Sequence, residues 1–158
     1  MEPAFEKVKG VVSATSGYTG GHTANPSYED VSFGSTGHYE AVEILYDPKQ
    51  VTYAQLLDVF WRNIDPTNAH GQFCDDGDQY RSAIFYSNEI ERQLAEQSAA
   101  KLVTSRMLNI ATSIQPRSTF YPAEEYHQDY YRKNPIRYEF YRFNCGRDRR
   151  LEQLWGKR

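Results

Sequence analysis

Residues 38–46 constrain the fold most, because their apolar side chains recur with the period of a β-strand. One face of this segment carries Val42, Ile44 and Tyr46. Asp47-Pro48 then turns the chain, and Thr52 is placed to cap a helix that we expect to run to about Asn63. A strand joined to an amphipathic helix by a short turn must bury one face of each element, so the pattern predicts a layered fold.

The remaining sequence predicts more elements of both kinds. Strands are expected at residues 11–16, 82–86 and 110–114, and helices at residues 2–8, 89–104, 126–132 and 149–155. Polar stretches with glycine and proline, residues 17–37 and 65–79, are expected to be long loops. We therefore expect one α+β domain over residues 1–158, a two-layer sandwich with a mixed open sheet and helices packed on it. Ordered loops of this length in a compact domain are usually functional.

Composition excludes several classes of partner. The 158 residues carry a formal net charge of −3, so nucleic acid is not expected. No apolar run is long enough to span a membrane, and the first residues do not resemble a signal peptide. We expect a cytoplasmic monomer, although an upstream segment could carry a targeting signal. The basic cluster Arg147, Arg149 and Arg150 is interpreted as a solvated helix face.

The two cysteines, Cys74 and Cys145, lie far apart in the sequence and do not indicate a small disulfide scaffold. They are interpreted either as unpaired thiols in a reducing compartment or as redox-active groups. Cys74 could also be combined with the histidines His22, His38, His70 and His127 into a metal site. No two of these residues have the close spacing of a ligand pair, so no metal is expected.

Five polar segments resemble the signature segments of the methionine sulfoxide reductase A family, in order and with its spacing. They are Gly17-Tyr18-Thr19-Gly20-Gly21-His22, Asn25-Pro26-Ser27-Tyr28, Thr36-Gly37-His38-Tyr39-Glu40, the run from Gly77 to Ile84, and the run from Phe120 to His127. The resemblance extends from Met1 to at least Pro135, and the tail Asn144-Cys145-Gly146-Arg147-Asp148 resembles one bacterial-type branch. Five segments in register are far more specific than any single motif.

The resemblance implies a ferredoxin-like α+β sandwich that reduces the S epimer of methionine sulfoxide, free or in proteins, to methionine. It implies no bound cofactor, because thioredoxin or dithiothreitol supplies the electrons. Glu40 would be the acid that protonates the sulfoxide oxygen, with Tyr28 and Tyr80 as hydrogen-bond donors to it. Asp75 and His127 would line the substrate pocket. Cys145 would be the resolving thiol that condenses with the oxidised attacking cysteine, with Cys74 as the alternative.

The family's attacking cysteine lies in a Gly-Cys-Phe-Trp-x-x-Glu motif, of which Glu2 matches the final residue. The cysteine, and the strand that leads into it, would therefore precede Met1. We expect the polypeptide as written to be inactive and to have an unpaired backbone edge. Two alternatives remain: a non-catalytic module that binds methionine sulfoxide peptides, and an enzyme whose nucleophile is Cys74 or Cys145.

Each proposed site residue also has an ordinary structural interpretation when it is taken alone. Glu40 would be an exposed strand carboxylate, and Tyr28 and Tyr80 would be packing residues. Asp75 would help to form a turn, and His127 would satisfy a local helix end. The five segments together favour the catalytic interpretation, because the family places all of these side chains around one pocket.

Overall fold

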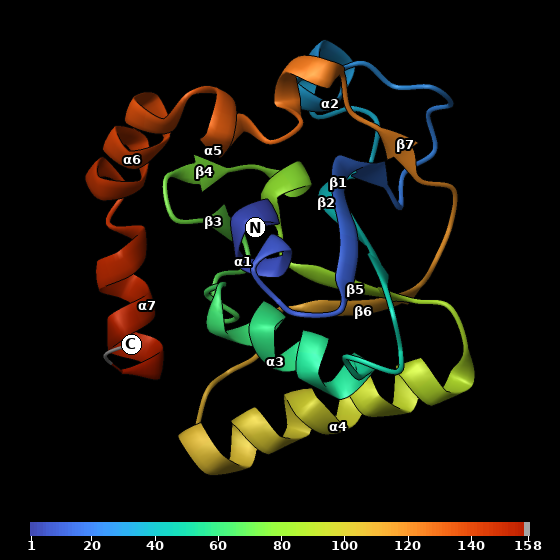
Figure 1. The fold of residues 1–158 in the computed structure, drawn as a ribbon, viewed down its shortest axis with the longest axis vertical. Helices are drawn as coiled ribbons and strands as arrows, with labels where there is room; N and C mark the ends of the chain where they lie inside the picture. Colours follow the sequence, from blue (N-terminus) through green and yellow to red (C-terminus); the bar gives the residue numbers. More distant parts are fainter. Residues whose placement is uncertain (157–158) are drawn as a thin grey trace.

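The fold is built from three small sheets and a cover of helices, as the computed structural model shows for residues 1–156 (Figure 1). The main sheet has the strand order β2-β1-β7, and all of its pairs are antiparallel. A two-stranded hairpin and a parallel pair make the other two sheets. The strands are β1 (Val11–Thr19), β2 (Tyr39–Tyr46), β3 (Gly71–Gln72), β4 (Asp75–Asp76), β5 (Ala83–Tyr86), β6 (Ser113–Pro116) and β7 (Tyr121–Pro122).

Helices lie below the sheets and along one side of them (Figure 1). Those below are α3 (Tyr53–Arg62) and α4 (Glu89–Arg106), and those at the side form an arm of α6 (Pro135–Asn144) and α7 (Arg147–Trp155). The shorter helices are α1 (Glu2–Glu6), α2 (Tyr28–Phe33) and α5 (Tyr130–Lys133), with 3-10 turns η1 (Asp78–Tyr80) and η2 (Glu125–His127). None of the described helices is both long and apolar enough to cross a membrane.

The α+β class is confirmed, and the elements with strong capping signals lie where the sequence predicts them. Thr52 caps α3 through a capping box with Gln55, and Asn88 caps α4 by accepting from the Glu91 amide. The apolar face of α3 buries Leu57 and Trp61 against β5 and α4. This packing forms the larger of the two buried clusters and joins the lower helices to the parallel strand pair.

The structure differs from the sequence-based expectations in five details. Helix α2 lies inside the expected loop 17–37, because Ser27 and Asp30 form a capping box and Gly34 ends the helix with a φ of 87°. Strand β6 lies a few residues later than the expected strand 110–114. The expected helix 126–132 is divided into η2 and α5 at Asp129, whose φ is 52°. Helix α6 was not predicted, and the expected single sheet is three sheets in the described residues.

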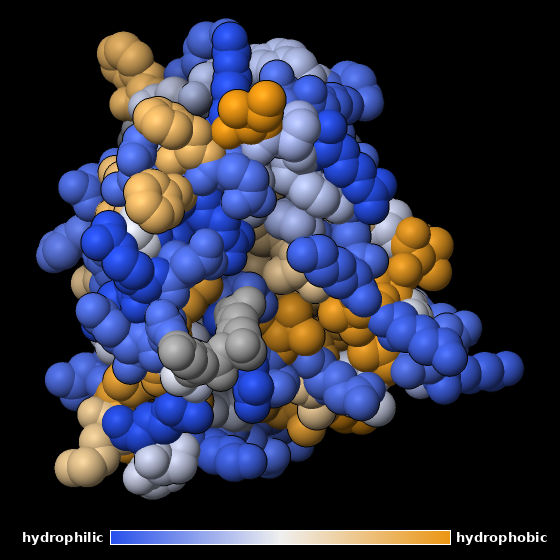
Figure 2. Space-filling view, turned by 60° about the vertical axis from the view of Figure 1, so that its left-hand side comes forward, coloured by the Kyte–Doolittle hydropathy of each residue, from blue (hydrophilic) through white to orange (hydrophobic). Residues whose placement is uncertain are grey.

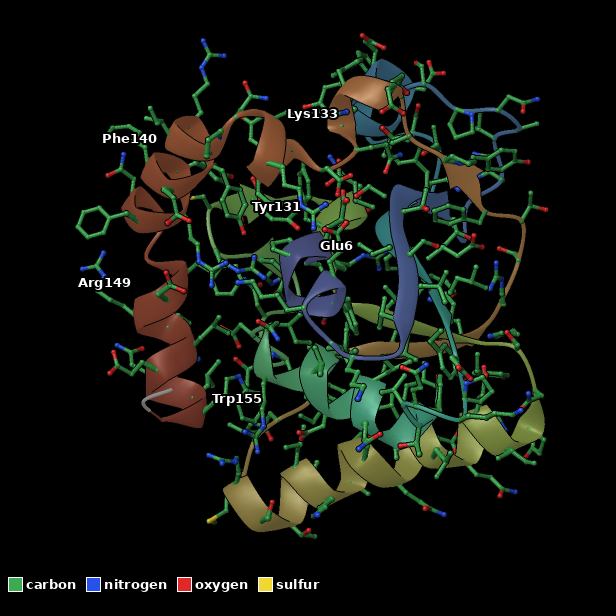
Figure 3. The ribbon with its side chains drawn as sticks, viewed as in Figure 1. Glu6, Tyr131, Lys133, Phe140, Arg149 and Trp155 are labelled. Carbon is green, nitrogen blue, oxygen red and sulfur yellow. A yellow bond between two sulfur atoms is a disulfide. The ribbon has the colours of Figure 1, made fainter. Side chains whose placement is uncertain are left out.

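The arginine cluster of α7 is less solvated than the sequence suggests. Arg150 pairs with Asp65 at 2.9 Å, and Arg147 donates to the carbonyl oxygen of Asn63 at 2.7 Å. Arg149 points away from the body of the molecule (Figure 3). Trp155 donates to the carbonyl oxygen of Ile64 at 3.2 Å, so three side chains of α7 fasten the arm to the end of α3 and the loop after it.

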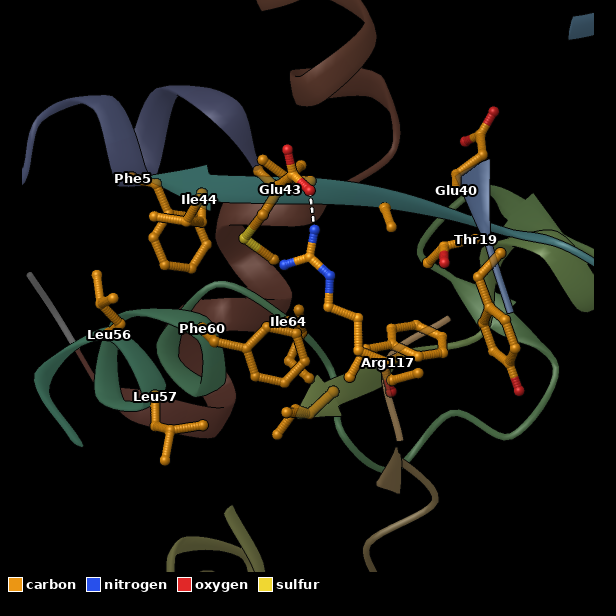
Figure 4. A pocket seen from close by; sticks show the side chains of 18 of the residues that line it. Phe5, Thr19, Glu40, Glu43, Ile44, Leu56, Leu57, Phe60, Ile64 and Arg117 are labelled. Carbon is orange, nitrogen blue, oxygen red and sulfur yellow. Dashed lines mark hydrogen bonds and ion pairs between the residues drawn. The ribbon is translucent and has the colours of Figure 1, made fainter. Parts of the chain in front are cut away.

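Two strand edges face one apolar cavity of about 340 Å³. In the described residues, β2 pairs only with β1, and β5 pairs only with β6, so each keeps one edge without a strand partner. Consecutive residues of both strands line the cavity, together with Phe5, Leu56 and Phe60. Figure 4 shows Arg117 reaching across this space to Glu43. Edges without a strand partner are therefore found on β2 and β5, whereas β1 pairs with β2 along its length and with β7 only at Gly17 and Tyr18.

Substitution of Gly17 by alanine is expected to destabilise the fold by about 1–3 kcal/mol, the usual cost of overpacking. Gly17 is buried in β1, and a Cβ there would lie 2.4 Å from Phe120 Cζ and 2.4 Å from the Tyr121 carbonyl oxygen. The free energy of unfolding from denaturant titration measures the effect. Ser13→Ala, at an exposed position of the same strand, is the control. Equal stability of the two variants would contradict the packing described here.

Candidate functional site

The end of the β1–β2 ladder places Glu40 directly opposite Tyr18. Tyr18 is 2% exposed, and the neighbouring Tyr39 is also buried. Successive side chains of a strand point to opposite faces. Glu40 is among the residues that line the cavity, and Figure 4 shows its carboxyl group at the upper end of the labelled residues. Much of the Glu40 residue remains accessible to solvent. Protein nevertheless surrounds its carboxyl group, and this burial and then the charge on Asp75 raise the pKa of Glu40 to about 7.

The glycine-rich loop after β1 is fixed by a buried histidine. The amide of Gly21 donates to Nδ1 of His38 at 3.0 Å, so the ring carries its proton on Nε2. That nitrogen donates to the Thr23 carbonyl oxygen at 2.6 Å. A Cβ on Gly21 would lie 2.4 Å from the His38 amide nitrogen, which explains the small residue there. His38 therefore serves the loop structurally.

The β3–β4 hairpin brings Asp75 to the site. Gly71 permits the hairpin, because a Cβ at this position would lie 1.9 Å from the Asp75 carbonyl oxygen. The following turn η1 lies against β2 and presents Tyr80. Burial, and then the charges on Glu40 and Asp75, raise the pKa of Tyr80 to about 12. Tyr80 therefore stays a protonated donor at neutral pH, close to both carboxylates.

Tyr28 and His127 complete one wall. Tyr28 is the first residue of α2, and its ring centroid lies 4.5 Å from that of His127 on η2. The Tyr126 ring lies on His127 at 4.2 Å. Nε2 of His127 lies 3.8 Å from Glu124 Oε2 and has no hydrogen-bond partner. The structure thus brings Tyr28, Glu40, Asp75, Tyr80 and His127 into one neighbourhood from five separate segments.

Glu2, at the start of α1, has contacts that hold the scaffold together. It is buried, and its carboxylate accepts from the Ser16 hydroxyl and, at 3.1 Å, from the Asp129 amide. The carboxylates of Glu2, Glu6 and Asp129 approach within 4.8 Å of one another. Glu6 accepts from the Tyr131 hydroxyl, and the two residues adjoin in Figure 3. These contacts tie α1 to β1 and to the start of α5.

The two cysteines are bonded to each other. Cys74 and Cys145 form a disulfide with a Cα–Cα distance of 5.3 Å, which replaces the interpretation as two unpaired thiols. Cys74 is exposed in the turn of the β3–β4 hairpin, and Cys145 ends α6. The disulfide therefore joins the C-terminal arm to the residue that immediately precedes Asp75.

Three residues of the site were not given roles from the sequence. Tyr18 lies close to the charged groups Glu40 and Glu124. The side-chain amide of Gln128 accepts from the Ser16 amide at 2.9 Å and donates to the Ser16 carbonyl oxygen at 2.8 Å. Tyr141 donates to Asp75 Oδ1 at 2.5 Å. Tyr18 belongs to the segment Gly17-Tyr18-Thr19, so the sequence held a signal for it. Tyr141 lies in a helix that was not predicted.

This arrangement supports acid catalysis at an oxygen atom. Glu40 can carry a proton near neutral pH, and Tyr28 and Tyr80 are phenol donors beside it. Donors fixed around a position where negative charge develops stabilise that charge without reorganising. The disulfide adds a group that can accept two electrons.

Comparisons with known proteins agree on one family. The family model described as peptide methionine sulfoxide reductase matches residues 1–158. The chain is 50% identical over 160 residues to peptide methionine sulfoxide reductase MsrA of Bacillus licheniformis, covering 100% of this chain and 88% of that protein.

Solved structures give the same result. The chain resembles reduced Mxr1 from Saccharomyces cerevisiae, with a TM-score of 0.80, 34% identity, and 85% and 79% of the two chains covered. It also resembles Mxr1 in complex with Trx2, with a TM-score of 0.51, 25% identity, and 77% and 67% covered.

The raised pKa of Glu40 predicts a pH-dependent stability. The pKa of a glutamate in an unfolded chain is about 4.3. Between that pH and about 7, the folded chain therefore binds more protons than the unfolded chain. The contribution of Glu40 is therefore fully present below pH of about 4.3 and is lost as the pH rises through about 7. We expect the denaturant midpoint of the wild type to fall across this window relative to that of Glu40→Gln. A constant difference between the two proteins would contradict the shift.

Proposed function

Because the chain belongs to the peptide methionine sulfoxide reductase family, we propose that its site reduces the S epimer of methionine sulfoxide, free or in proteins, to methionine. The observation that carries the proposal is the neighbourhood of Glu40, Tyr28 and Tyr80. A sulfoxide is a weak electrophile at sulfur until its oxygen is protonated or strongly hydrogen-bonded. An acid with a pKa near 7 and two phenol donors supply what that oxygen needs.

We assign the roles as follows. Glu40 donates a proton to the sulfoxide oxygen, and Tyr28 and Tyr80 hold that oxygen as a thiolate attacks the sulfur. The charge of Asp75 beside Glu40 favours the protonated form of Glu40 by like-charge repulsion. His127, stacked between Tyr28 and Tyr126, forms the wall against the rest of the substrate. Glu2 supports the scaffold through Ser16 and Asp129.

The cysteines are proposed to regenerate the enzyme. The attacking thiolate takes the oxygen and becomes a sulfenic acid. Cys145 then condenses with it, releases water and forms a mixed disulfide. Cys74 attacks that disulfide, which frees the attacking thiol and leaves the Cys74–Cys145 bond. Both cysteines thus take part, and no prosthetic group is needed.

The attacking thiol is proposed to reside outside residues 1–158, because both cysteines of these residues serve the regeneration step. We expect no turnover of methionine S-sulfoxide by residues 1–158 with dithiothreitol. An upstream extension that completes the motif Gly-Cys-Phe-Trp-x-x-Glu, with Glu2 as its last residue, should give turnover. An inactive extended protein that still binds the S epimer would support the alternative, a non-catalytic module for methionine sulfoxide peptides.

In the extended protein, Glu40→Gln is expected to lower kcat/KM about 10²- to 10⁴-fold, because an amide cannot supply the proton. Steady-state kinetics with a methionine S-sulfoxide peptide measure this. Glu43→Gln is the matched control, since Glu43 lies in the same strand and its contact is an ion pair with Arg117. Retained activity of Glu40→Gln would remove Glu40 from the role of acid.

Thioredoxin is the proposed reductant, and the arm offers it an apolar surface. Ile136, Phe140 and Phe143 of α6 are 85%, 68% and 76% exposed, and Phe143 lies two residues before Cys145. Figure 3 shows Phe140 pointing away from the molecule, and Figure 2 shows apolar patches among hydrophilic surface on the side that carries the arm. A reductant bound over this surface would adjoin the exposed Cys74.

Phe143→Ser is expected to slow the reduction of the Cys74–Cys145 disulfide by thioredoxin about fivefold, which corresponds to about 1 kcal/mol of docking energy. Reduction by dithiothreitol should keep its wild-type rate, because a small dithiol needs no docking surface. Phe33→Ser, at an 87% exposed phenylalanine of α2, is the control. Equal slowing with both reductants, or with the control, would contradict docking at α6.

A further inference from the structure

Two contacts join α6 to the β3–β4 hairpin. On the hairpin they involve two adjacent residues, and on α6 they involve residues one helical turn apart. Tyr141 Oη donates to Asp75 Oδ1 at 2.5 Å. Cys145 is bonded to Cys74, the residue before Asp75. Residues four apart on a helix lie on the same face, so the phenol and the sulfur of α6 reach the hairpin together.

We propose that Tyr141 is a positioning residue that holds the Asp75 carboxylate beside Glu40, and that the Cys74–Cys145 disulfide keeps Tyr141 in this place. The oxidation state of two cysteines would thereby be transmitted to the site. The inference deepens the proposed function, on which it rests for the meaning of Glu40 as the acid. The coupling itself can be measured without any turnover.

The hydrogen bond alone is a weak tether. Tyr141 is half exposed and Asp75 is partly exposed, so water competes for both groups. The disulfide changes this, because it fixes the helix end against the hairpin and raises the effective concentration of the phenol at Asp75. Once the disulfide is reduced, the helix end is free to separate, and Asp75 loses its donor.

Asp75 in turn acts on Glu40 through charge. The Tyr141 phenol holds the Asp75 carboxylate in place, and the charge of Asp75 is, after burial, the second cause that raises the pKa of Glu40. Without the donor, repulsion from Glu40 turns the Asp75 carboxylate toward solvent. Glu40 then loses part of the repulsion that keeps it protonated.

The other titratable groups around this pair do not replace Asp75. The groups that face it from the neighbouring elements are Tyr18 of β1, Tyr28 of α2, Tyr80 of η1, Tyr141 of α6, and Glu124 and Tyr126 near η2. Burial is the main cause that raises the pKa of Tyr18, Tyr80 and Tyr141, so these phenols stay neutral through the range in which Glu40 titrates. The charge of Glu124 raises the pKa of Tyr18, whereas the charge of Asp75 raises the pKa of Glu40 itself.

The first test is a titration of Glu40 in residues 1–158 by carboxyl-detected NMR, with the disulfide intact. Tyr141→Phe is expected to lower the midpoint of Glu40 by about half a pH unit or more. Tyr138→Phe is the matched control, because its hydroxyl lies one turn earlier on α6 and accepts from Arg142 Nη1 at 3.0 Å. An unchanged midpoint in Tyr141→Phe, or an equal fall in the control, would overturn the proposal.

The second test is reduction of the same samples. Dithiothreitol gives two electrons and two protons to Cys74 and Cys145 and is itself oxidised to a cyclic disulfide. The wild-type midpoint should fall on reduction, and that of Tyr141→Phe should change little. Asp75→Asn should lower the midpoint and remove the effect of Tyr141→Phe. An equal fall on reduction in the wild type and Tyr141→Phe would show that the phenol does not transmit the change, even if the extended protein is an active reductase.

Discussion

The antiparallel ladder of β1 and β2 runs from Val11 opposite Tyr46 to Thr19 opposite Tyr39, and the site is assembled at the latter end. The register of the ladder puts Glu40 opposite Tyr18. The glycine-rich loop begins where β1 ends, and His38 holds it by accepting from the Gly21 amide. β7 pairs with the same end of β1, so η2 and its histidine follow within a few residues. A shift by one residue would turn Glu40 to the other face of the strand. The position of the acid therefore depends on the register of this ladder.

Two carboxylates of the site differ in what surrounds them. Glu40 has protein around its carboxyl group, and this burial is the largest cause of its raised pKa, so its neutral form is favoured. Asp75 is held by a hydrogen bond from the Tyr141 hydroxyl at 2.5 Å. A carboxyl group whose surroundings favour its neutral form is the candidate acid of such a pair. The backbone of the hairpin and the helix of the arm supply this difference.

Local signals in the sequence were sufficient where a cap or an alternation pattern existed. Thr52 and Asn88 marked their helices, and residues 38–46 marked β2. Ser27 and Asp30 carried a signal of the same kind for α2, but glycine and proline around it favoured a loop. The site residues followed from five segments in register. The Cys74–Cys145 bond did not, because a pairing across 71 residues depends on where α6 lies, and α6 has no side-chain cap to mark its start.

The edges of β2 and β5 that lack strand partners in the described chain face a cavity with apolar walls. Such edges present rows of amide and carbonyl groups that can template pairing with a foreign strand. The ion pair of Arg117 and Glu43 places two charged side chains across the opening of this cavity. These two edges are therefore the places where the described part of the chain is open to the addition of a further strand.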